Sequence, residues 1–333
     1  CDDPKSDEEL GEVGMKFSRQ TTLKTRVTLT GVGVHSGAPV TLILGPAGID
    51  AGFVFIRTVD GTEREVKAVA SAVTATAYAT VLGDREGALV STAEHVLAAL
   101  RGMGVDNATV EVDGPEIPIM DGSAAPFVAA IDRAGIVQQA APRRFLEVLK
   151  PIQVRIGESL GELRPYAAGF RAEIEIDFAH PLIGRQAFNL DLTPETFRRD
   201  ICRARTFGYM KDVASLWSAG YARGASFANS VVFDDDRLLN SEGLRYADEC
   251  ARHKALDVIG DLTLAGLPLL GLYRSVKGGH KLNHAVLTAL LADRHAWRVV
   301  EAEPARRSRT AAEVVGGMLG GGIVAPAYAP DVT

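Results

Sequence analysis

The sharpest chemical pattern in the sequence is a histidine followed by two aspartates at intervals of four residues. His253, Asp257 and Asp261 lie in the segment RHKALDVIGD, and in a helix this spacing puts all three on one face. Zinc takes imidazole nitrogen and carboxylate oxygen, and a catalytic site usually combines three protein ligands with one position for water. The pattern therefore offers two metal ligands. A solvated helix face is the alternative, although the apolar neighbours of Asp257 favour burial, where a carboxylate needs a partner.

A second histidine, with a carboxylate directly before it, offers a third ligand. Glu94 and His95 are adjacent in STAEH, and in HExxH metalloproteases a glutamate next to a ligand histidine activates the zinc-bound water. The alternative for Glu94 is a capping box, because Ser91 and Glu94 have its spacing at a helix start. Both interpretations remain open from the residues alone.

Two further histidines lie in glycine-rich segments. His280 follows a pair of glycines in KGGH after the apolar run LLGLY, and could be a loop-mounted acid or oxyanion stabiliser that Asp261 keeps charged near neutral pH. A surface histidine is the alternative, and the same choice applies to His35 in GVGVHSG. The glycines around His35 match neither GxGxxG nor a P-loop, which argues against a dinucleotide or ATP site.

The elements that must position these residues are of mixed type. From Thr21 onward, and again in FVFIRTV and EVKAVAS, the sequence alternates with the period of strands, whereas residues 91–103 have helical spacing. Strands in LEVLKPIQVRI and RAEIEIDFA, a helix from about Pro194, a strand in NSVVFDD and a long helix over 246–265 follow. Runs of strands followed by helices indicate an α+β fold rather than a doubly wound parallel sheet.

The length of the chain indicates two domains, because 333 residues exceed the usual size of a single core. We expect two similar α+β domains at 18–140 and 145–303, joined by the polar segment QQAAPRRF. Residues 1–17 and 304–333 are expected to be a disordered or extraneous tail and a flexible tail.

Charge and cysteine content exclude several functional classes. A net charge of −6 argues against a nucleic-acid partner, and three cysteines without a CxxC pair support neither a disulfide framework nor a thiolate zinc site. No apolar run reaches the roughly 20 residues of a membrane-spanning helix. We therefore expect a cytoplasmic protein without an integral membrane segment.

Six motifs, in order, together resemble the zinc-dependent UDP-3-O-acyl-N-acetylglucosamine deacetylase family of lipid A biosynthesis. They are GVGVHSG, STAEH, EIPIMDGSAAPF, CRARTFGYM, RHKALDVIGD and GGHKLNH. The resemblance implies two layered α+β domains with the active site between them, and hydrolysis of the N-acetyl group of a UDP-linked acylated amino sugar with release of acetate. It further implies one Zn²⁺ per chain, at a site that Fe²⁺ can also occupy, and we expect a monomer.

The resemblance also implies roles for individual residues in the chemistry. His95, His253 and Asp257 would be the zinc ligands, and Glu94 the general base. His280, held by Asp261, would be the oxyanion stabiliser or general acid, and Thr206 would help to polarise the acetamide carbonyl. Either Glu94 or His280 could then protonate the leaving amine.

For the substrate, the resemblance implies contacts with the sugar and with the acyl chain. Phe207 would pack on the sugar, Lys254 would contact the substrate, and His35 would lie at the outer part of the site. The segment 210–232 resembles the insert that forms a hydrophobic passage, lined by Met210, Val213, Ala222, Phe227, Ser230 and Val232.

Two alternative functions remain. One is a zinc amidohydrolase that acts on another N-acylated sugar, and the other is a carbohydrate-binding relative without catalytic activity. The presence of Glu94 beside a ligand histidine argues against the second, because a binding module needs no base at that position.

Overall fold

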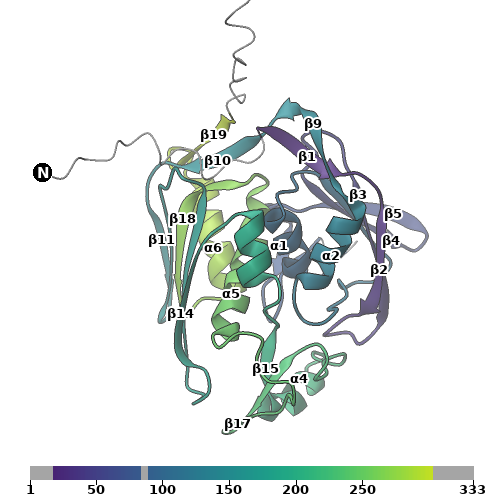
Figure 1. The fold of residues 1–333 in the computed structure, drawn as a ribbon, viewed down its shortest axis with the longest axis vertical. Helices are drawn as coiled ribbons and strands as arrows, with labels where there is room; N and C mark the ends of the chain where they lie inside the picture. The colour runs from purple at the N-terminus through teal and green to yellow at the C-terminus, as the bar shows by residue number, and fades with distance from the viewer. Residues whose placement is uncertain (1–17, 84–88, 303–333) are drawn as a thin grey trace, which may run out of the picture. The chain divides into compact units, whose positions relative to one another are not determined.

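Two β-sheets enclose the helices that carry the predicted site residues (Figure 1). The computed structural model describes residues 18–83 and 89–302, so the tails expected at 1–17 and 304–333 lie outside the described residues. The fold is mixed α+β, as predicted. No helix within these ranges is long and apolar enough to cross a membrane.

The first sheet has five strands in the order β2-β3-β8-β4-β5. The strands are β2 (Val27–Val32), β3 (Pro39–Pro46), β4 (Phe53–Val59), β5 (Thr62–Lys67) and β8 (Ala108–Val112). All neighbours are antiparallel except β4 and β8, which are parallel. The helices α1 (Glu94–Gly102) and α2 (Ala125–Ala134) lie on the inner side of this sheet (Figure 1).

The second sheet has seven strands and is centred on β18 (Leu269–Val276). The others are β10 (Arg144–Val148), β11 (Ile152–Ile156), β12 (Ser159–Arg164), β13 (Phe170–Phe178), β14 (Gly184–Asp191) and β19 (Trp297–Glu301). Along β13 the buried residues Ala172, Ile174 and Ile176 alternate with the more exposed Glu173 and Glu175. This period of two gives the sheet one apolar face, which packs on α5 (Glu249–Leu262) and α6 (His280–Ala292).

The two helical layers meet where α1 packs on α5. Gly260 permits this contact, because a Cβ atom at this position would lie 2.1 Å from the backbone oxygen of Glu94. Twelve of the fourteen residues of α5 are buried. The helix that carries the HxxxD pattern is therefore central to the molecule, and the alternative of a solvated helix face is wrong.

The segment expected as an irregular linker is mostly extended. Ile136–Pro142 form β9, which pairs with β1 (Arg19–Leu23), and β10 begins at Arg144. β1 and β9 form a sheet of only two strands, and every residue of β9 is exposed or only partly buried. Such a strand has no buried apolar face, so the sequence shows no alternation.

The predicted acyl-passage insert belongs to a small substructure at one end of the described residues, where α4 is labelled (Figure 1). Residues 210–232 contain α4 (Val213–Ser218) and the first two residues of β16 (Val231–Asp234). The flanking strands β15 (Phe207–Tyr209) and β17 (Arg237–Leu238) form one sheet with β16.

Candidate metal centre and active site

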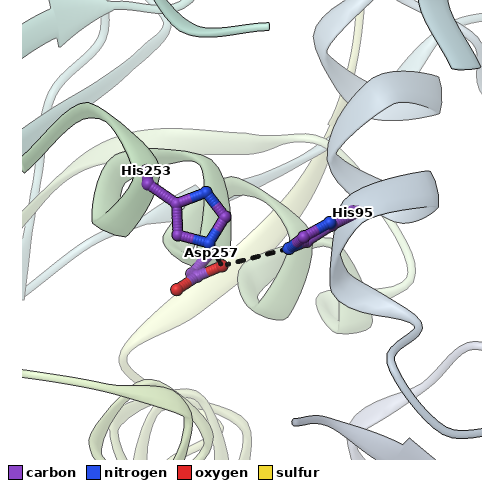
Figure 2. Close-up of side chains that lie close together, drawn as sticks. All are labelled: His95, His253 and Asp257. Atoms are coloured by element: carbon purple, nitrogen blue, oxygen red, sulfur yellow. Dashed lines mark ion pairs between the residues drawn. The ribbon is translucent and has the colours of Figure 1, made fainter. Parts of the chain in front are cut away.

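The three predicted ligands converge from two helices (Figure 2). Atoms of His95 on α1 and of His253 and Asp257 on α5 all lie within 4.8 Å of one another. Nε2 of His253 is 3.4 Å, and Nε2 of His95 is 3.9 Å, from the same Asp257 Oδ1. Ligand atoms about 2.1 Å from a tetrahedral zinc ion would be roughly 3.4 Å apart. The spacing therefore fits a metal ion.

The protonation states of these residues also suit a metal. Nδ1 of His253 donates to the Ala204 carbonyl at 3.1 Å, which leaves Nε2 with its lone pair toward Asp257. Burial lowers the pKa of His253. Burial, and the repulsion that would arise if both rings were protonated, lower the pKa of His95 to about 3. Both imidazoles are thus neutral, as metal ligands must be.

Asp257 gives the most direct indication of a missing partner. Burial alone would raise its pKa, but the ammonium of Lys254 holds the pKa well below its usual range. Nζ of Lys254 donates to Oδ2 at 2.8 Å, whereas Oδ1 is buried without a hydrogen-bond partner among the described residues. An unsatisfied buried charge is costly, and a cation beside Oδ1 removes that cost.

Glu94 is the first residue of α1, and its side chain is 3% exposed. The capping-box alternative is wrong, because the N-cap Ala93 has no side chain to form one and no bond to the side chain of Ser91 occurs. Instead, Oε2 accepts a hydrogen bond from the backbone N–H of Thr80 at 3.0 Å, and Oε1 lies 3.8 Å from Nε2 of His280. Burial raises the pKa of Glu94 to about 7, against the opposing effect of His280.

His280 lies at the first position of α6, not in a loop. Its side chain is 10% exposed, so the surface alternative is also wrong. Nδ1 donates to Oδ2 of Asp261 at 2.8 Å, and Asn283 and Thr80 also donate to this carboxylate, at 2.8 and 2.6 Å. Burial alone would lower the pKa of His280, but Asp261 and Glu94 together raise it to about 10. A cationic acid thus faces a carboxylate base.

Three of the residues predicted to contact the substrate are Lys254, Phe207 and Thr206. Lys254 lies with Nζ 5.6 Å from the ring centre of Phe207, and that ring is 6.3 Å from the ring of His253. Thr206 is fixed through its backbone, whose N–H donates to Gly122 and whose oxygen accepts from Val231. Lys254 and Phe207 therefore lie beside the predicted metal centre, and Thr206 is the residue before Phe207.

His35 links the first half of the chain to the predicted insert. Its Nδ1 accepts a hydrogen bond from the backbone N–H of Ala222 at 3.4 Å, and its ring lies edge-on to Tyr221 at 5.2 Å. Of the six predicted passage residues, Met210 and Phe227 are 47% and 52% exposed. Ser230 is buried, and Val213, Ala222 and Val232 are intermediate.

Three supporting residues were missed in the sequence. Thr80 bonds both Glu94 and Asp261, but nothing in the surrounding residues marks it. Asn283 is three residues after His280 on the same helix, a spacing that could have indicated a shared face. Glu116, which is 3% exposed, accepts from the backbone N–H groups of His35 and Ser36 at 2.8 Å; it lies in the EIPIMDG motif, which gave the only available signal.

A buried His-His-Asp group with an adjacent carboxylate base and a charged histidine defines a metal-dependent hydrolase. The chain belongs to the UDP-3-O-acyl N-acetylglycosamine deacetylase family (LpxC), whose model matches residues 20–292. It is similar to the UDP-3-O-acyl-N-acetylglucosamine deacetylases of Brucella ovis and Brucella abortus, each 50% identical over 284 residues, which cover 85% of this chain and 99% of each relative. The family predicted from the six motifs is thereby confirmed.

Proposed function

We propose that this protein removes the N-acetyl group of UDP-3-O-acyl-N-acetylglucosamine by hydrolysis, an early step of lipid A biosynthesis, at one Zn²⁺ held by His95, His253 and Asp257. The observation that carries the proposal is the convergence of three buried ligand atoms beside Glu94 and His280. Fe²⁺ suits the same nitrogen and oxygen donors. When bound, the metal lowers the pKa of a coordinated water toward ~7 and polarises the acetamide carbonyl.

Glu94 is proposed to act as the general base. Its Oε2 is occupied by the N–H of Thr80, so Oε1 is the atom that accepts a proton from the attacking water. A pKa of about 7 suits a group that first accepts and later releases a proton near neutral pH. Glu94, once protonated, and His280 are the two groups able to protonate the leaving amine.

His280 is proposed to stabilise the negative charge that develops on the carbonyl oxygen. Asp261 orients the ring through Nδ1 and leaves Nε2 directed to the side of Glu94. A cation held in place before the reaction stabilises such charge without reorganisation. Thr206, fixed at both backbone groups, is proposed to assist at the same oxygen.

The substrate would be held by residues on both sides of the centre. We propose that Phe207 packs on the sugar, that Lys254 contacts the substrate, and that His35 lies at the outer part of the site. The exposed apolar side chains of Met210 and Phe227 support an acyl-chain passage along the insert, with Val213, Ala222, Ser230 and Val232. We also propose a cytoplasmic monomer with domains at 18–140 and 145–303.

Metal analysis and acetate release from UDP-3-O-acyl-N-acetylglucosamine test this function together. We expect wild type to hold about one metal ion, and Glu94→Ala to keep the metal while turnover falls by about 10²–10⁴-fold. Asp257→Ala should lose both metal and turnover. Asp293→Ala is the matched control, because its carboxylate pairs with Lys150 at the far end of α6.

Retention of the metal by Asp257→Ala, or of turnover by Glu94→Ala, would contradict the assigned roles. Binding of the substrate by wild type without acetate release would support the carbohydrate-binding alternative instead.

A further inference from the structure

A buried ion pair outside the ligand set joins the loop at residues 203–206 to the start of α5. The side chains of Arg205 and Glu249 are 2% and 1% exposed. Glu249 Oε1 accepts from both the backbone N–H and Nε of Arg205, at 3.0 and 2.9 Å. Oε2 accepts from Arg205 Nη2 at 3.2 Å and from the backbone N–H of Arg245 at 2.6 Å. Both carboxylate oxygens are therefore fully engaged.

The position of this pair relates it to the metal centre. Glu249 lies four residues before His253, so the two side chains leave α5 on the same face. The residue before Arg205 is Ala204, whose carbonyl accepts the Nδ1 proton of His253. The residue after it is Thr206. The ion pair thus fixes a segment with two tasks. Its Ala204 carbonyl orients His253, and its Thr206 is proposed to contact the acetamide carbonyl of the substrate.

The guanidinium requires the planar, multiple-donor geometry of arginine. Besides its bonds to Glu249, it donates through Nη1 to Glu242 at 2.6 Å and through Nη2 to the Gly243 carbonyl at 2.8 Å. A lysine would keep the charge but has a single nitrogen, so it cannot reproduce these bonds.

Stability alone is a weak explanation for such a pair. The cost of removing two charges from water often equals or exceeds their attraction, and well-packed apolar side chains are frequently as stable. This pair, however, connects the segment of the Ala204 carbonyl to α5, the helix that carries His253. Groups that hydrogen-bond to metal ligands and orient them typically contribute about 10–100-fold to metal affinity or activity.

We infer that Arg205 and Glu249 are positioning residues of the metal centre, which hold the Ala204 carbonyl against His253 and set the place of Thr206. This inference rests on the proposed function, since it assumes that His253 binds the metal. It assigns no contact with substrate to either side chain.

Arg205→Lys and Glu249→Gln test the inference in the full-length protein. We would measure the dissociation constant for Zn²⁺ by competition with a chelator, the visible spectrum of the Co²⁺-substituted protein, and the melting temperature. Both variants should bind Zn²⁺ about 10–100-fold more weakly and show an altered Co²⁺ spectrum, because the ring of His253 loses its fixed orientation. If Arg205→Lys does not fold, Glu249→Gln decides alone.

Asp106→Asn is the matched control. Its carboxylate pairs with Nε of Arg143 at 2.9 Å, with side chains 8% and 12% exposed, and it lies beyond the far end of α1 from His95. We expect it to lower the melting temperature without changing Zn²⁺ affinity. If the variants of Arg205 and Glu249, like Asp106→Asn, lower the melting temperature without changing Zn²⁺ affinity, this inference is overturned and the proposed function is not affected. A wild-type protein that binds no stoichiometric metal would overturn the proposed function as well.

Discussion

Replacing Asp261 by asparagine should move the alkaline limit of activity. Asp261 accepts the Nδ1 proton of His280 at 2.8 Å and, with Glu94, raises the pKa of that imidazole to about 10 against the effect of burial. His280 is cationic below its pKa, so its contribution is present at lower pH and is lost as the pH rises through that value. Asparagine keeps the size of the side chain and removes its charge.

The magnitude follows from the protonated fraction of His280. With the pKa near 10, almost all of the wild-type protein carries the cation at pH 8. If the pKa returns to the ordinary value of 6.5, only about 3% carries it at pH 8, but most of the protein does at pH 6. The ratio of variant to wild-type turnover should therefore fall roughly 25-fold between pH 6 and pH 8.

The assay is kcat/KM for acetate release between pH 5.5 and 10, on metal-loaded protein. The ratio to wild type at each pH cancels titrations that the two proteins share. Asp293→Asn, at the other end of α6, should leave the profile unchanged. A variant with a uniform loss at every pH would refute the reasoning, because it would show that Asp261 acts through packing and not through the charge of His280.

Two further perturbations test the helix contact and the passage. Gly260→Ala places a Cβ 2.1 Å from the Glu94 backbone oxygen, so α1 and α5 must separate. We expect the free energy of unfolding, measured by denaturant titration, to fall by about 1–3 kcal/mol. We also expect weaker metal binding. Gly48→Ala, with nothing within 4 Å of its Cβ, is the control, and equal effects of both would contradict the expectation. Phe227→Ser should raise KM about tenfold or more for substrates with long acyl chains but little for those with short ones. Ile49→Ser, also at an exposed apolar residue, is the control and should leave KM unchanged. A change in KM that does not depend on chain length would argue against a passage at Phe227.

Local spacing predicted the parts of the site that a single element presents. His253 and Asp257 are one helical turn apart, so the helix period alone predicts that they share a face. The place of His280 was harder to predict, because α6 begins after Gly279, which provides no side-chain cap. Without a Ser, Thr, Asp or Asn at that position, the usual signal of a helix start is missing.

The contacts between elements could not be predicted from the residues alone. Thr80 and Asp261 are 181 positions apart and bond at 2.6 Å, and no periodicity carries information over that separation. The convergence of His95 with α5 likewise depends on the packing of α1 against α5 at Gly260. The local pattern offered His95 as a third ligand, and the resemblance of the motifs to a family joined it to His253 and Asp257, but neither indicated Thr80.

The two buried carboxylates of the site, Glu94 and Asp257, lie in environments that suit their different proposed roles. Burial alone would raise the pKa of both Glu94 and Asp257. The ammonium of Lys254 lies 2.8 Å from Asp257, and its charge outweighs burial and keeps the carboxylate ionised, as the proposed ligand role requires. Glu94 has one backbone N–H at 3.0 Å and its nearest cation, His280, only at 3.8 Å, so burial prevails and its pKa rises to about 7. Environments that separate the pKa values of neighbouring acids suit them to different tasks, which supports the proposed roles of Glu94 in proton transfer and of Asp257 as a ligand.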